Sequence, residues 1–304
     1  METLRIGGYQ PEASVHTRAM RIAEAVITQR CAPALSVSFV DNVVAHGRRA
    51  GDLLEMVESG ELDLCYFSSS YLVRRVPALA VFDLPFQVSD RMALFARLDG
   101  ALGASLADAA AAATGYRVLA YWDNGFRHIS NRLRPIRHPG DCSGLKLRTM
   151  NNALHQRVFR RLGFEPVFID VAQLRQAVAD HLVDAQENPL TNLLNFGLHQ
   201  HHRYVSLSGH FLGVALVLVN RVRFDSWPAA IQSAIREAIT QATAAQRGFA
   251  IDEDVRCLAE LKAEGVEVTA ADEMDLQAFA AAVKDIVAEQ TSAIDKKILR
   301  QFAG

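Results

Sequence analysis

Short apolar runs alternate along the chain with stretches of helical periodicity. In the first part, the runs with strand character are residues 4–8, 36–40, 62–67 and 116–122, and the helix-like stretches are 14–28, 51–58 and 101–113. Strands that alternate with helices are typical of βαβ units. This order predicts a parallel sheet with helices on both of its faces.

A second series of the same kind follows. Its strand-like runs are residues 146–149, 165–168 and 183–186, and its helix-like stretches are 152–162 and 171–181. Residues 212–219 then form a long apolar strand that has no partner nearby in the sequence. We expect this strand to return to the first sheet.

The stretch after Trp227-Pro228 has an unusually long helical pattern. Proline is favoured at the start of a helix, and apolar residues recur at helical spacing afterwards. Apart from Gly248, nothing interrupts the pattern before Gly265. A helix over 228–263 would measure ~50 Å. A chain of 304 residues is expected to form two lobes, and this helix would run across both.

The composition is that of an ordinary globular protein, with 50% apolar and 22% charged residues. The net charge of −2 gives no support to a nucleic-acid or anionic-membrane partner. No apolar run approaches the ~20 residues of a membrane span. Residues 4–6 already have strand character, so we expect a mature or never exported form without a leader. The cysteines, which we expect to be free buried thiols because no CxxC pair occurs, are Cys31, Cys65, Cys142 and Cys257.

Two arginines and one amide follow or end candidate strands. These residues are Arg127, Arg148 and Asn188. Ligands of open α/β sheets lie outside the carboxyl ends of strands. Arginine presents a rigid fork of donors that matches a carboxylate, and a buried arginine requires an anion. The sequence therefore suggests a site for a small organic acid.

Several motifs, in their order and spacing, resemble the solute-binding proteins of tripartite ATP-independent periplasmic (TRAP) transporters. The resemblance extends from Ile6 to about Val287. The segments that carry it are Trp122-Asp123-Asn124-Gly125-Phe126-Arg127, residues 131–135, Gly144-Leu145-Lys146-Leu147-Arg148 and residues 183–189, with Leu84-Pro85-Phe86 and residues 162–167 as further landmarks.

The resemblance implies an α/β fold of the two-lobed periplasmic-binding-protein type, a clamp with strands crossing between the lobes and a long helix spanning both. We place lobe I at residues 1–124 plus 213–250 and lobe II at 125–212 plus 251–304. The resemblance further implies that Arg148 makes the two-point contact to a ligand carboxylate, that Arg127 adds a second cation, and that Asn188 donates a hydrogen bond. It implies a periplasmic monomer without cofactor that delivers its ligand to TRAP membrane subunits.

One departure from the family bears on the ligand. Some acid-sugar-binding members carry an acidic residue after the third strand, where this chain has a serine run that begins at Ser68. Strand parity directs Tyr66 and Trp122 towards the cleft, where their rings would contact an apolar tail. We therefore expect a 2-oxo or 2-hydroxy monocarboxylate with a branched or aromatic tail. Gln10 is a further candidate for the distal end of the ligand.

The same residues have structural alternatives. Arg127 would pair with an acidic residue such as Asp123, and Asn188 would cap the helix after Pro189. Tyr66 and Trp122 would be core aromatics. The histidines, for which we expect a solvated surface and no metal site, are His199, His201 and His202.

Two other functions would use the same cleft. A carboxylate-processing lyase or hydrolase would need a general base, for which His128, Asp123 and Glu187 are the candidates. No nucleophile elbow, phosphate loop or dinucleotide fingerprint occurs. A ligand sensor would pass occupancy to a signalling partner. We favour a non-catalytic receptor that closes on its ligand about a hinge.

Overall fold

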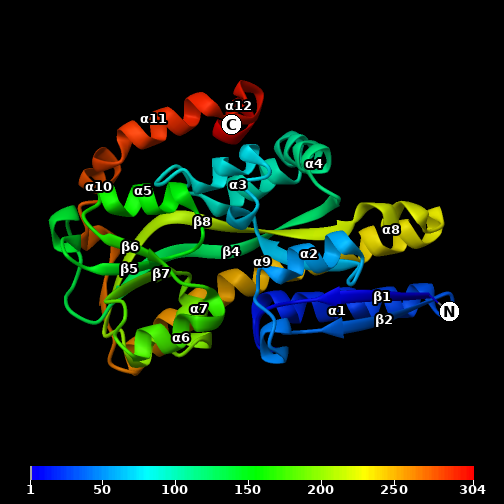
Figure 1. Ribbon diagram of the computed structural model, residues 1–304, viewed down its shortest axis with the longest axis horizontal. Coiled ribbons are helices and arrows are strands. Elements are labelled where there is room, and N and C mark those ends of the chain that lie inside the picture. Colours follow the sequence, from blue (N-terminus) through cyan, green and yellow to red (C-terminus); the bar gives the residue numbers. More distant parts are fainter. Residues whose placement is uncertain (1) are drawn as a thin grey trace.

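A computed structural model describes residues 2–304 and shows a mixed α/β fold (Figure 1). The strands are β1 (Glu2–Gly7), β2 (Leu35–Val40), β3 (Leu64–Ser68), β4 (Tyr116–Asn131), β5 (Lys146–Thr149), β6 (Glu165–Phe168), β7 (Ala185–Asn188), β8 (Tyr204–Asn220) and β9 (Glu267–Thr269). The α-helices are α1 (Val15–Cys31), α2 (Asp52–Ser59), α3 (Arg91–Leu98), α4 (Ala101–Ala113), α5 (Ala153–Arg161), α6 (Val171–Ala179), α7 (Leu190–Asn195), α8 (Arg221–Ser226), α9 (Ala229–Ala263), α10 (Leu276–Ala282), α11 (Lys284–Ala293) and α12 (Lys296–Ala303).

One continuous sheet connects both lobes, in the order β2-β1-β3-β8-β4-β7-β5-β6, with β9 beside β8. The sheet is mixed, whereas a parallel sheet was expected. β8 runs antiparallel to β3 and β4, and β4 runs antiparallel to β7. The predicted strand 212–219 does return to the first sheet, where Val219 lies opposite Leu64. β4 and β8 are each far longer than predicted because they pass through both lobes (Figure 1).

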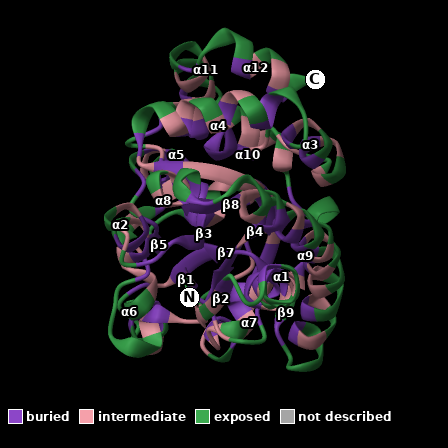
Figure 2. Ribbon diagram, turned by 90° about the vertical axis from the view of Figure 1, so that its right-hand side faces the viewer, coloured by how far each residue is buried: buried purple, intermediate pink, exposed green. Residues whose placement is uncertain are grey.

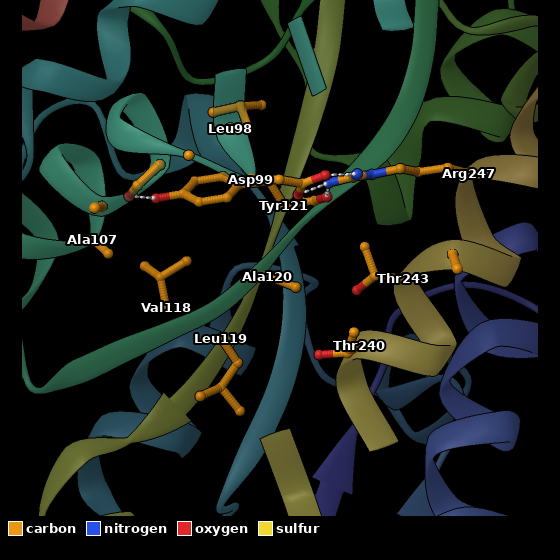
Figure 3. Close-up of a pocket in the computed structure, with 14 residues that line it drawn as sticks. Leu98, Asp99, Ala107, Val118, Leu119, Ala120, Tyr121, Thr240, Thr243 and Arg247 are labelled. Atoms are coloured by element: carbon orange, nitrogen blue, oxygen red, sulfur yellow. Dashed lines mark hydrogen bonds and ion pairs between the residues drawn. The ribbon is translucent and has the colours of Figure 1, made fainter. Parts of the chain in front are cut away.

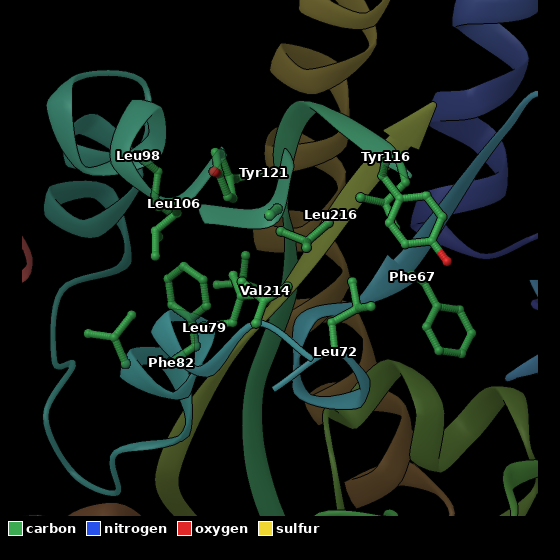
Figure 4. Close-up of a cluster of buried hydrophobic side chains, with 14 of the residues drawn as sticks. Phe67, Leu72, Leu79, Phe82, Leu98, Leu106, Tyr116, Tyr121, Val214 and Leu216 are labelled. Carbon is green, nitrogen blue, oxygen red and sulfur yellow. The ribbon is translucent and has the colours of Figure 1, made fainter. Parts of the chain in front are cut away.

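Helices cover both faces of the sheet in the first lobe. Along β8, Leu216 and Leu218 belong to one core cluster, and Val217 and Val219 belong to the other. This alternation follows from the two-residue period of a strand. Figure 4 shows the first cluster, in which Leu216 lies among side chains from β3, β4 and α4. The second cluster lies beneath α1 and the first half of α9.

The second lobe repeats this arrangement with two smaller clusters. Ile129 of β4 and Leu147 of β5 pack against α5 and α10 on one face. Val205 of β8 packs with α6 and α7 on the other face. Figure 2 shows the strands buried inside and the exposed helix faces outside. Both lobes therefore bury their strands between helices, as the two-lobed α/β fold requires.

Helix α9 has the predicted length and spans both lobes. It contains 35 residues, which corresponds to ~52 Å. Near its start, Ile235 and Ile239 join the core under α1. Near its end, Cys257 and Leu261 join the core of the second lobe. Gly248 lies within the helix and does not interrupt it.

The C-terminal helix α12 lies on the first lobe. Its residues Ile298 and Phe302 share a cluster with Leu94 and Leu98 of α3, whereas the sequence placed 251–304 in the second lobe. Because the polypeptide ends on the first lobe, the segment before α12 also passes between the lobes, as β4, β8 and α9 do. We propose that lobe I consists of residues 1–124, 213–250 and 294–304, and that lobe II contains the remainder.

Two further expectations concern the chain as a whole. The cysteines are all free and buried, as predicted. Over residues 2–304, no helix combines the length and apolar character that a membrane span needs.

Candidate ligand-binding site

A small cavity lies where strand ends of the two lobes meet. Strands β3, β4, β5 and β7 and helix α7 supply most of its wall. The lining residues are Tyr9, Ser68, Tyr71, Asn124, Arg127, Arg148, Met150, Val171, Asn188, Asn192 and Phe196. The structure thus brings together four of the residues predicted from the sequence, namely Ser68, Arg127, Arg148 and Asn188.

Arg148 is a buried cation with few partners. It extends from β5 and is only 1% exposed. Its Nε donates to the carbonyl oxygen of Ile169 at 2.8 Å, and its Nη2 is buried without a hydrogen-bond partner. No carboxylate among residues 2–304 lies within ion-pair distance of it. Burial lowers the pKa of Arg148, and the neighbouring charge of Arg127 acts in the same direction. The guanidinium would be stabilised by an anion.

Arg127 is paired, but not with the residue that the sequence suggested. Its Nε and Nη2 lie 2.5 Å and 2.8 Å from the carboxylate oxygens of Glu187. Burial alone would lower the pKa of Arg127, but the charge of Glu187 outweighs it, and the pKa is raised. His210 Nε2 contacts the same carboxylate at 3.3 Å. Asp123 instead lies 3.4 Å from Arg91.

Asn188 faces the cavity and is not a helix cap. Its Oδ1 lies 3.3 Å from both Arg127 Nη2 and Asn192 Nδ2. The N-cap of α7 is Pro189, which makes no side-chain capping bond. Asn188 contributes its amide to the cavity wall because it ends β7, directly after Glu187.

Tyr66, Trp122 and Gln10 do not line this cavity. Tyr66 hydrogen-bonds Thr17, and Trp122 Nε1 donates to Thr243 at 2.9 Å, within the core beneath α1 and α9. The prediction that these two rings face the cleft is wrong, and their reading as core aromatics is right. The Oε1 of Gln10 contacts His16 at 3.1 Å in the buried layer behind the cavity.

The aromatic residues that do line the cavity are Tyr9, Tyr71 and Phe196, of which the two tyrosines follow strands of the first lobe. Burial raises the pKa of Tyr71, and the charge of Arg148 opposes that rise. Tyr9 follows β1 and Tyr71 follows β3, each a few residues beyond the strand end. The rule that ligands lie beyond the carboxyl ends of strands would have indicated both. Tyr66, two residues before the end of β3, is instead directed into the core beneath α1 and α9.

The cavity encloses only about 20 Å³. A single water molecule needs ~10–15 Å³ by the same measure. The walls of the two lobes are therefore in close contact here, and an organic acid would enter only after they separate. A buried contact across the cleft accompanies this closure, since Asn152 Nδ2 of the second lobe donates to Asp83 Oδ2 of the first at 2.7 Å.

A larger cavity of about 530 Å³ lies between α4, β4 and α9. Figure 3 shows Arg247 at its edge beside Asp99, with Val118 to Tyr121 of β4 along its floor. Arg247 donates to the two carboxylate oxygens of Asp99 at 2.7 Å and 2.8 Å. Its charge is therefore compensated within the protein, unlike that of Arg148, and this cavity is the weaker candidate for an anion.

The remaining candidates for chemistry are engaged elsewhere. His199 and His202 are buried, so the expected solvated surface is wrong for both. Over residues 2–304, no cluster of three or more potential metal ligands occurs. Burial lowers the pKa of His128 to about 3, and the backbone N–H of Gly209 donates to its Nδ1. Burial raises the pKa of Glu187, but Arg127 more than offsets this and lowers it overall.

Comparisons with known proteins agree with this geometry. The chain matches the family model "Bacterial extracellular solute-binding protein, family 7" over residues 9–293. It is 33% identical to a solute-binding protein of Verminephrobacter eiseniae over 82% of this chain and 73% of that protein.

Two solved structures of similar proteins contain small acids. A TRAP periplasmic solute-binding protein from Bordetella bronchiseptica, with density assigned to pantoate, has 28% identity and a TM-score of 0.91 over 100% of this chain and 99% of its own. The sugar acid binding protein of Advenella mimigardefordensis, in complex with galactonate, has 26% identity and a TM-score of 0.92 over 99% and 96%.

The family match extends over both lobes and the cavity between them. It agrees with the resemblance that the arginine and strand motifs of the sequence carry. The fold of the whole chain, crossing strands included, superposes on the two similar solved structures with TM-scores of 0.91 and 0.92. The chain therefore belongs to family 7 of the bacterial extracellular solute-binding proteins, the periplasmic binding proteins of TRAP transporters.

Proposed function

We propose that this protein captures a small monocarboxylate in the cavity between its lobes, with Arg148 as the main contact. The observation that carries the proposal is the charge balance of the cavity. Two guanidinium groups face it, and Glu187 compensates only that of Arg127. One buried positive charge remains, which matches a ligand of one negative charge. In this proposal Arg127 and Asn188 add further hydrogen bonds.

The wall of the cavity supports a ligand with both hydroxyl and apolar groups. Ser68, Asn124 and Asn192 offer polar atoms, whereas Val171 and Phe196 offer apolar surface. Pantoate and galactonate, found with two similar proteins, are both 2-hydroxy monocarboxylates. The proposed ligand is therefore a 2-hydroxy or 2-oxo acid. A ligand with a branched tail would contact both the polar and the apolar residues of the wall. These residues differ from Tyr66 and Trp122, which were predicted from the sequence to contact the tail.

The proposed role is transport rather than catalysis. The candidate bases Glu187 and Asp123 are held by Arg127 and Arg91, respectively. Two lobes that close on a ligand suit a receptor that signals occupancy by its shape. In this proposal the closed form delivers its ligand to the membrane subunits of a TRAP transporter.

Calorimetry with pantoate, galactonate, glucuronate and succinate tests the proposal. We expect pantoate or galactonate to bind more tightly than succinate. Arg148→Ala should weaken binding by roughly two to four decades, because breaking a buried charged pair typically costs ~3–5 kcal/mol. Arg148→Lys should restore little, because a point charge does not replace a two-point contact. A loss below about tenfold in the alanine variant would exclude this role for Arg148.

A further inference from the structure

A chain of buried hydrogen bonds leads from the cavity to a histidine on the far side of β4. Arg127 Nη2 lies 3.3 Å from Asn188 Oδ1, and Asn188 Nδ2 lies 2.5 Å from Gln186 Oε1. Gln186 Nε2 lies 2.5 Å from Ser130 Oγ, and Ser130 Oγ lies 2.9 Å from His202 Nδ1. All five side chains are at most 6% exposed. Ser130 and Gln186 are paired across β4 and β7.

The cation at the cavity end fixes the direction of this chain. A guanidinium only donates, so Asn188 must turn its oxygen towards Arg127. Its nitrogen then faces Gln186, which must accept through its oxygen. The nitrogen of Gln186 in turn donates to Ser130. Each amide orientation therefore follows from the one before it.

Ser130 completes the chain at His202. The hydroxyl oxygen accepts from Gln186, and its own proton is directed to His202 Nδ1 if that nitrogen is unprotonated. His202 then carries its proton on Nε2, which is buried without a partner among residues 2–304. The opposite tautomer would leave two groups without partners, the Ser130 hydroxyl proton and the Nε2 lone pair. The Nε2–H tautomer is favoured because it leaves only one.

Reversal of the chain is opposed at its cavity end. If His202 carried its proton on Nδ1, the hydroxyl of Ser130 could donate only to Gln186. Gln186 would then have to present its oxygen to Ser130, which requires the amides of both Gln186 and Asn188 to be turned over. Asn188 would then direct its NH₂ group at Arg127 Nη2, donor against donor. The same turn would also oppose Asn192 Nδ2, which lies 3.3 Å from Asn188 Oδ1.

We propose that neutral His202 is a positioning residue, which acts through Ser130 and Gln186 to hold the Asn188 amide in its ligand-binding orientation. In this orientation the oxygen of Asn188 is engaged by Arg127, and the second N–H of its amide remains available to an acceptor on the ligand. The inference rests on the proposed function of the cavity. It adds a residue that does not touch the ligand.

The surroundings of His202 keep it neutral. Burial lowers the pKa of His202 to about 3, and the nearby groups His201, Arg132 and His181 act in the same direction. The carboxylate of Asp184 opposes them. The chain should therefore keep its direction throughout the pH range of the periplasm.

Two variants of His202 separate positioning from packing. His202→Asn keeps an acceptor near the place of Nδ1, whereas His202→Leu removes it. With pantoate as the probe, and galactonate as a second one, we expect the leucine variant to bind about three- to tenfold more weakly. The asparagine variant should stay within about twofold of the wild type. Ser130→Ala, which breaks the chain at the next link, should reproduce the loss if the leucine variant does not fold.

Nitrogen NMR of the wild-type imidazole provides a readout that requires no ligand. We expect the Nε2–H tautomer of His202, without titration between about pH 5 and pH 8. An Nδ1–H tautomer, or equal weakening by the asparagine and leucine variants, would overturn the inference. If the wild type bound neither pantoate nor galactonate, the proposed ligand class would be wrong. The tautomer of His202 would still show in which direction the hydrogen bonds between Arg127 and His202 run.

Discussion

At the scale of residues, the candidate site depends on which buried charges have partners. Arg127 and Glu187 form a buried pair, whereas at the larger cavity the partly buried Arg247 pairs with the exposed Asp99. Arg148 has no such partner among residues 2–304. Buried ions without partners are rare because desolvation is costly. The unpaired charge of Arg148 is therefore the reason to place the anion in the small cavity and not in the larger one beside Arg247.

The buried carboxyl group of Asp123 predicts how the stability of the protein changes with pH. Burial raises its pKa to about 6, against the opposing charge of Arg91. The folded state therefore holds this proton more tightly than the unfolded state, and its contribution to stability is lost as the pH rises through about 6. Between about pH 5 and pH 7 the loss should be roughly 1 kcal/mol. We predict that Asp123→Asn removes this part of the pH dependence.

Urea denaturation of both proteins across this pH range measures the difference. The asparagine retains an oxygen for the backbone N–H of Gly125, which lies 2.7 Å from Asp123 Oδ1. The variant therefore preserves the turn, while it removes both the ionisation and the charge that faces Arg91. Parallel stability curves for the two proteins would contradict the assignment.

At the scale of elements, the crossing of β4 between the lobes is irregular. The register of β4 against β8 shifts between Asp123 and Phe126. Gly125, within this shift, has a φ of +82°. A Cβ there would lie 3.0 Å from Cβ of Pro189, which precedes α7. Irregular backbone at a crossing suits a hinge, because a few residues absorb the change of direction.

We predict that Gly125→Ala destabilises the protein by about 1–2 kcal/mol, because an L-residue is strained at positive φ. Gly248→Ala is the matched control. Gly248 lies within α9, and a Cβ there meets nothing within 4 Å. Alanine should stabilise that position by about 0.5–1 kcal/mol. Denaturation midpoints would measure both changes, and a Gly125→Ala variant as stable as the wild type would show that the crossing is not strained.

At the scale of the whole molecule, the closed cavity requires a second, open arrangement of the lobes. An organic acid cannot enter about 20 Å³. The elements that connect the lobes are β4, β8 and α9, together with the segment that leads to α12. Their bending would open the cleft, while the separate core clusters of the lobes would move as rigid bodies.

Solution scattering tests this motion. We predict that a binding ligand from the proposed class decreases the radius of gyration, because it favours the closed form. The Arg148→Ala variant should show no decrease at the same ligand concentration. An unchanged radius in the wild type at saturation would contradict closure about a hinge.

Much of the fold could be predicted from local patterns alone. Helix α9 begins and ends within a residue of the predicted span, because Pro228 permits its start and the apolar spacing continues to Gly265. β5 and β6 match the predicted ranges as well. Arg148 and Asn188 are expected at a site because both lie at or just after the end of a predicted strand, a property that follows from the positions of elements in the chain.

Other features were decided by tertiary structure. The direction of β8 against β3 and β4 leaves no mark in its sequence, because a strand buried on both faces has no polar period. For the same reason, parity did not reveal that Tyr66 and Trp122 face a helix-covered core. The pairing of Arg127 with Glu187 depends on β4 and β7 lying side by side, although 60 positions separate the two residues. Local sequence determines where strands begin and end, whereas the partners of buried charges depend on how distant strands pair.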